Sequence, residues 1–68
     1  MMNKELLRSV MVLHKETNSD LAKLLDISEA SVSAKINENG TEFKQGEIAK
    51  IRTHYQLTDK QVTDIFFA

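Results

Sequence analysis

The feature that most restricts the fold of this chain is its lack of residues that interrupt helices. It contains no proline, and its two glycines, Gly40 and Gly46, lie only six positions apart. Proline and glycine are the residues that most disfavour a helix interior, whereas the leucine, alanine, lysine and glutamate that are frequent here favour it. The sequence therefore predicts an all-α fold.

The length of 68 residues is that of one small domain, which we expect to span 1–68. A chain of this size buries only about 60% of the surface that it exposes when unfolded, so we expect a thin margin of stability. It has no cysteine, so neither a disulfide nor a thiolate metal site can supplement the core, which agrees with a reducing compartment. Residues 1–7 lack the basic and then apolar organisation of a signal peptide, and no apolar run approaches the ~20 residues that span a bilayer. These observations predict a cytoplasmic protein with no membrane partner.

Apolar spacing and capping residues predict five helices. The first begins at Asn3 and ends near His14, and it carries more apolar residues than one buried face requires. Its first stripe, which we expect to face the core, consists of Leu6, Val10 and Leu13. A second stripe beside it consists of Leu7 and Met11.

The starts of the later helices follow from local capping patterns. Thr17 and Asp20 form a capping box, and so do Thr58 and Gln61. Ser28 is an N-cap, and the fourth helix covers about 45–54. The apolar residues that these four helices are expected to turn inward are Leu21, Ala22, Leu25, Val32, Ile36, Ile48, Ile51, Tyr55, Val62, Ile65 and Phe66.

The segment from about 17 to 40 is the most informative part of the chain. Two short capped helices are joined by a turn of three or four residues, a pattern that predicts a helix-turn-helix motif. Asp26 suits the left-handed conformation that so tight a turn requires. Ala22 is small where the helices cross, while Ile27 and Val32 close the core between them. The N-terminal part of the second helix would then face outward, able to enter a DNA major groove.

This segment resembles the Cro/CI-type (XRE-like) helix-turn-helix family. The likeness continues in Asn37, Gly40-Thr41-Glu42-Phe43, Glu47-Ile48 and Ile65-Phe66-Phe67, which are similar to small Cro-like and repressor-modulator proteins of temperate phages of Gram-positive bacteria. The resemblance implies a compact five-helix repressor-like domain and a role in the choice between lysogenic and lytic growth. The DNA-contacting positions that it implies are Asn18, Ser28, Glu29, Ala30, Ser31, Ser33, Ala34, Lys35 and Asn37.

The charge of the second helix of the motif departs from that family, whose members commonly carry Arg, Lys, Gln or Thr there. Residues 26–38 contain three acids, Asp26, Glu29 and Glu38, against one base, Lys35. Neutralisation of phosphates supplies most of the non-specific affinity for DNA, so this face is expected to bind DNA weakly. The formal net charge of the whole chain, -1, agrees with that expectation.

The favoured hypothesis is therefore an antirepressor, which binds the phage repressor and so affects its binding to operator DNA. The acidic face around Asp20, Asp26 and Glu29 would pair with the basic DNA-contacting face of the repressor. Leu7 and Met11 would add an apolar contact, although such residues more often belong to a core.

The alternative hypothesis is an autonomous Cro-like repressor that binds operator DNA as a homodimer. In that case the helix that follows Ser28 would lie in the major groove, and phosphates would be met by Lys23, Lys35 and Lys44. Phe67 is a candidate for the dimer or partner contact.

An enzyme is the remote alternative. His14 and His54 are 40 residues apart on different predicted helices, and no Ser-His-acid pattern has a recognisable spacing. We therefore expect no catalytic residue, no metal, no cofactor and no small-molecule ligand.

Overall fold

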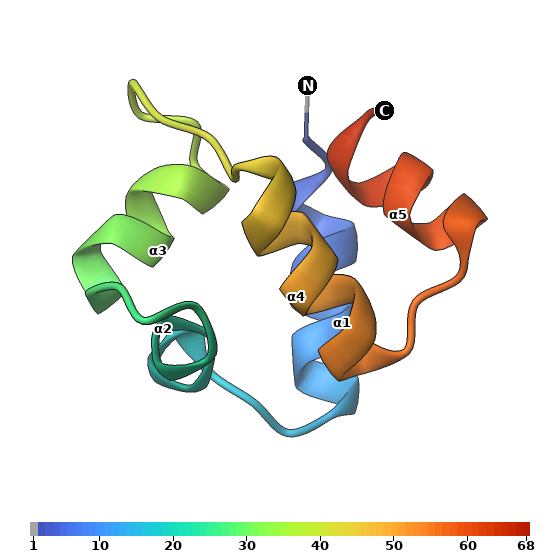
Figure 1. Cartoon of the computed structure of the whole chain (residues 1–68), viewed down its shortest axis with the longest axis horizontal. Coiled ribbons are helices and arrows are strands. Elements are labelled where there is room, and N and C mark those ends of the chain that lie inside the picture. Colours follow the sequence, from blue (N-terminus) through green and yellow to red (C-terminus); the bar gives the residue numbers. More distant parts are fainter. Residues whose placement is uncertain (1) are drawn as a thin grey trace.

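The structure, a computed structural model, describes residues 2–68, and within this range it contains five helices and no strand (Figure 1). This confirms the predicted all-α class. The helices are α1 (Lys4–Leu13), α2 (Asn18–Leu25), α3 (Glu29–Ile36), α4 (Gln45–Tyr55) and α5 (Asp59–Phe66). None of the helices in the described part of the chain is long and apolar enough to cross a membrane.

The helices begin where the capping patterns predicted. The side chain of Asn3 accepts a hydrogen bond from the backbone N–H of Leu6, and that of Ser28 accepts one from Ser31, each at 3.1 Å. In the capping box of α2, the carboxylate of Asp20 accepts from the backbone N–H of Thr17 at 2.8 Å. Each bond satisfies a backbone or side-chain group that the first helical turn leaves without an intrahelical partner.

Residues 26–28 connect α2 to α3, and this turn depends on a left-handed residue as expected. Asp26 has a φ of 57°, and its cap N–H donates to the carbonyls of Ala22 and Lys23. Ile27 follows, partly buried against the core, and its N–H also donates to the carbonyl of Ala22 at 3.1 Å. Because the chain changes direction within these three residues, α3 packs on α2.

The helices form two packed pairs, α1 with α5 and α2 with α3. α4 connects the pairs because it contacts both α5 and α2. α3 packs mainly on α2, so in Figure 1 it stands at the edge of the molecule farthest from α5. The core between these elements consists of Leu7, Met11, Leu21, Ala22, Leu25, Val32, Ile36, Phe43, Ile51, Tyr55, Leu57, Ile65 and Phe66.

The predicted orientation of α1 is wrong. Leu7 is 0% exposed and Met11 is also buried, whereas Leu13, which was expected to face inward, is 81% exposed. Each residue advances about 100° around a helix, so a buried face centred on Leu7 and Met11 places Val10 at its edge and Leu13 on nearly the opposite side of the helix. Leu7 and Met11 are therefore core residues and do not form a contact surface for a partner.

Candidate functional site

The outer face of α3 carries small side chains and one carboxylate. Val32 and Ile36 are buried, which confirms the narrow inward stripe predicted for this helix. Glu29 and Ala30 are exposed, and the partly exposed positions are Ser31, Ser33 and Ala34. A backbone covered by such short side chains can come close to another macromolecule. The structure thus places five of the predicted contact residues on one accessible helix.

The polar residues at the two ends of α3 are already engaged in local hydrogen bonds. The hydroxyl of Ser28 accepts from the N–H of Ser31 and lies 3.0 Å from the Ser31 hydroxyl. At the other end, the amide nitrogen of Asn37 donates to the carbonyl of Ser33 at 3.0 Å, and its oxygen accepts from the ammonium of Lys4 at 3.3 Å. Asn18, the first residue of α2, is partly exposed.

Lys35 does not lie where the sequence prediction placed it. It is only 7% exposed, and its ammonium donates to the Glu47 carboxylate of α4 at 2.9 Å. It also lies 3.5 Å from the carbonyl oxygen of Glu42. A lysine held in this way is not available to a DNA phosphate. The assignment of Lys35 as a DNA contact is therefore wrong, because its charge is satisfied within the protein.

The electrostatics of Glu47 explain why this pair is ionised. Partial burial alone would raise the pKa of its carboxyl. Hydrogen bonds from the Lys35 ammonium and from the backbone N–H of Lys44, together with the charges of both lysines, outweigh that effect and lower the pKa below its ordinary value of 4.5. Glu47 is therefore a carboxylate at neutral pH and compensates the charge of Lys35.

Three carboxylates around α3 are more exposed than that of Glu47. Asp26 lies exposed in the turn before the helix, Glu29 in its first turn, and Glu38 just beyond its end. None of the three forms an ion pair within residues 2–68. Because Lys35 is neutralised by Glu47 from α4, residues 26–38 present three carboxylates and no available ammonium. The surface is more acidic than the sequence of this segment indicates.

Asp20 differs from these carboxylates because it has a structural partner. Its pKa is lowered, first by the hydrogen bond from the backbone N–H of Thr17 and then by the Thr17 hydroxyl. The side chain is partly exposed and remains charged while it caps α2. It contributes negative potential to the surface beside α3, but its oxygens are already occupied in part.

A second polar cluster was missed because its members are far apart in the sequence. The carboxylate of Glu16 accepts from the Tyr55 hydroxyl at 2.9 Å and lies 2.9 Å from Nε2 of His54. His14 and His54 both pack against the ring of Tyr55, with centroid separations of 5.0 and 4.8 Å. Burial and the Glu16 carboxylate raise the pKa of Tyr55. The cluster ties the end of α1 to α4, which no local pattern predicts.

The cluster combines a carboxylate, a phenol and two imidazole rings in mutual contact, and these contacts hold the end of α1 against α4. No group of three or more His, Cys, Asp or Glu side chains within the described residues is arranged to hold a metal ion.

Comparison with known proteins gives no further assignment, because no family model, curated protein or solved structure matches the chain.

Proposed function

We propose that this chain controls transcription as an antirepressor, which binds the DNA-contacting face of a repressor and keeps it from its operator. In this proposal α2, the turn at residues 26–28 and α3 form a helix-turn-helix unit whose outer surface contacts protein. The partner class follows from the resemblance to phage repressor modulators. The charge of the surface supports it independently.

The observation that carries the proposal is the burial of Lys35 in its ion pair with Glu47. A face that binds DNA needs cations at the phosphates, since their neutralisation drives association. The one lysine of α3 is withdrawn from that role, and Asp26 and Glu29 remain exposed. Such a face repels phosphate and attracts the basic surface with which a repressor contacts DNA.

Charge complementarity of this kind acts mainly on recognition and association rate. It steers the acidic face towards the basic one and places the two proteins in register. While the complex lasts, the repressor cannot present the same face to DNA. Since the interacting charges are exposed, binding should weaken as the salt concentration rises.

Operator binding is the second candidate, and one observation favours it. The outer side of α3 bears only short side chains beyond Glu29, so the helix could lie deep in a groove. Lys23 and Lys44 are exposed and could meet phosphates. These two lysines would act against the carboxylates at both ends of α3, so we rank this function below the antirepressor.

The test combines a DNA-binding assay with a matched charge reversal. A labelled operator is bound by the repressor encoded nearest to this chain, and the purified chain is added at physiological salt. We expect it to release the operator without binding DNA itself. Glu29→Lys should weaken this effect by about 10-fold. Asp64→Lys, the same charge change on α5, should leave it unaltered.

Two results contradict the proposal. If the chain alone shifts operator DNA at low concentration and physiological salt, operator binding is its primary function. If Glu29→Lys and Asp64→Lys release the operator equally well, α3 is not the face that contacts the repressor.

A further inference from the structure

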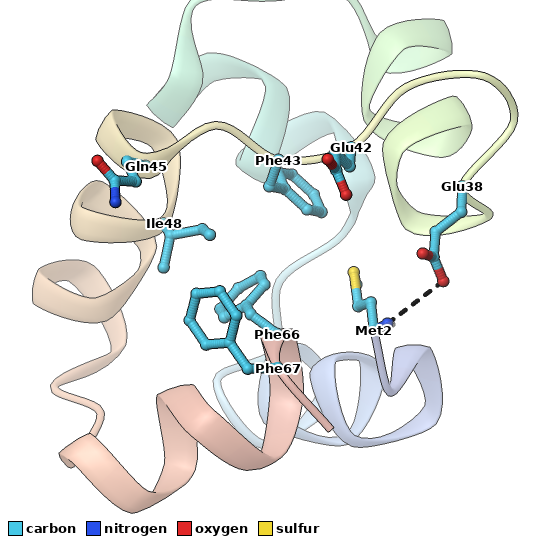
Figure 2. A pocket seen from close by; sticks show the side chains of 8 residues that line it. All are labelled: Met2, Glu38, Glu42, Phe43, Gln45, Ile48, Phe66 and Phe67. Carbon is cyan, nitrogen blue, oxygen red and sulfur yellow. Dashed lines mark hydrogen bonds between the residues drawn. The ribbon is translucent and has the colours of Figure 1, made fainter.

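A groove with an apolar floor opens between the loop that follows α3, the start of the chain and the end of α5. Figure 2 shows Ile48, Phe66 and Phe67 on one side of it and Met2 with Glu38 on the other. Phe43, Glu42 and Gln45 complete its lining. Phe66 is buried against the core, whereas Phe67 is 62% exposed although its ring lines the groove. An aromatic ring so exposed is a candidate for contact with another molecule.

The size of the groove limits what it can hold. Its volume is about 200 Å³, below the roughly 300–1,000 Å³ of sites that enclose a small-molecule ligand. A space of this size suits one bulky apolar side chain. Such a pocket for a single anchor residue is typical of protein–protein contacts.

The rim of the groove is acidic. Glu38 and Glu42 are exposed, and neither forms an ion pair within residues 2–68. A second hollow at this loop is lined by the same two carboxylates with Gly40 and Thr41. The two glutamates therefore stand between an apolar pocket and a polar one.

The position of Glu38 is fixed by its backbone. Its φ is 54°, its N–H donates to the carbonyl of Lys35 at 3.3 Å, and its carboxylate accepts from the N–H of Met2 at 3.3 Å (Figure 2). One carboxylate is thus held beside the apolar floor, so that an apolar side chain and a cation of the same ligand can be bound side by side.

We propose that this groove binds a basic segment of a partner protein, which inserts one apolar side chain against Phe67 and seats neighbouring Lys or Arg side chains on Glu38 and Glu42. Nucleic acid does not fit, because the rim repels phosphate. A second copy of this chain joined groove to groove does not fit either, since a two-fold contact would set the same carboxylates against each other.

The groove lies at the C-terminal end of α3, opposite the end that carries Asp26 and Glu29. A basic protein bound to the outer face of α3 could extend into it; this link alone rests on the proposed function. The groove itself can be tested without a repressor.

The probe is a short capped peptide that carries one phenylalanine flanked by lysines on both sides. Matched peptides replace the phenylalanine with alanine or the lysines with glutamates. The isotope-labelled full chain is titrated with each peptide, and backbone amide shifts are recorded by NMR. We expect shifts for Met2, Ile48, Phe67 and residues 38–42 with the first peptide only, and none at 29–34.

Variants assign the two parts of the interaction. Phe67→Ala should weaken binding by about 10-fold; the ring is mostly exposed, so the variant should stay folded. Glu38→Gln with Glu42→Gln should weaken it by about threefold and reduce its dependence on salt. Glu29→Lys, which disables the outer face of α3 in the proposed function, should bind the peptide as well as the unaltered chain.

The inference is overturned if no groove amide shifts at peptide concentrations on the order of 1 mM. It is equally overturned if the alanine peptide binds as well as the phenylalanine peptide. Shifts of the groove amides that follow the concentration of the protein alone, with no response to peptide, would assign the groove to self-association instead.

Discussion

The ion pair between Lys35 and Glu47 can be tested through the stability of the fold. Lys35→Met keeps an unbranched side chain of similar reach. It removes the ammonium that donates a hydrogen bond to the Glu47 carboxylate at 2.9 Å. The two side chains are only 9% and 15% exposed, so the carboxylate left behind is poorly hydrated. Breaking a fully buried pair costs about 3–5 kcal/mol, and losing one hydrogen bond to a charged group about 1.5–3 kcal/mol.

The second range applies here, because both groups keep some contact with solvent and the methionine restores apolar packing. We expect Lys35→Met to lower the free energy of unfolding by about 2 kcal/mol. The total for a domain of this length is on the order of 3–10 kcal/mol. The midpoint of thermal unfolding should accordingly fall by roughly 8–16 °C.

The same variant should change the response to acid. The pKa of Glu47 is lowered in the folded chain, so its ionised form contributes stability above the ordinary value of 4.5. That contribution is lost as the pH falls through the lower, folded-state pKa. Lys35→Met removes the largest of the effects that lower this pKa, so the loss of stability between neutral and acidic pH should become smaller.

Urea unfolding followed by circular dichroism, repeated across this pH range, measures both effects. A variant within about 0.5 kcal/mol of the unaltered chain would refute the reasoning. It would mean that the pair contributes no net stability and that Lys35 is free to leave it.

Three further substitutions test the fold. Leu7→Ala should cost about 2–5 kcal/mol in unfolding free energy because Leu7 is fully buried, whereas Leu13→Ser should change it by less than about 0.5 kcal/mol; equal effects in thermal unfolding would contradict the orientation of α1. Gln56 ends α4 with a φ of 54°, a left-handed conformation that is strained for a residue with a Cβ, so Gln56→Gly should stabilise the chain by about 0.5–1 kcal/mol. A loss of stability in urea would contradict this strain.

The helix starts could be predicted because their determinants are local. Asn3, Ser28 and Thr58 each lie three residues from the N–H that they cap, and Asp20 lies three residues from the N–H of Thr17 that it caps. The left-handed turn at Asp26 is equally local, because aspartate tolerates this conformation better than most residues other than glycine.

The misplaced residues have determinants that lie elsewhere in the chain. Periodicity shows that α1 has an apolar side, but which of two adjacent stripes is buried depends on how α5 packs against it. Lys35 has the sequence context of a surface lysine, and its partner Glu47 lies 12 positions away on another helix. Likewise, Glu16 and Tyr55 meet across 39 positions. Capping and periodicity contain no information on such contacts.

The burial of Lys35 also makes the charge of the α3 surface depend on a residue outside α3. Glu47→Gln removes a carboxylate but keeps an oxygen that can accept from Lys44, so the chain should fold with reduced stability and gain one positive charge near α3. Lys35→Met has the opposite effect on charge, because it leaves the Glu47 carboxylate without its cation.

These two variants separate charge from stability, since both weaken the fold while they change the surface charge in opposite directions. If the acidic face binds a basic repressor, Lys35→Met should release the operator from the repressor at least as well as the unaltered chain, and Glu47→Gln less well. Non-specific DNA binding should follow the reverse order. Asp64→Asn, which removes the same charge from α5, serves as the control. If both variants are impaired to the extent that they are destabilised, the position of α3 governs binding, and the electrostatic argument for the antirepressor loses its basis.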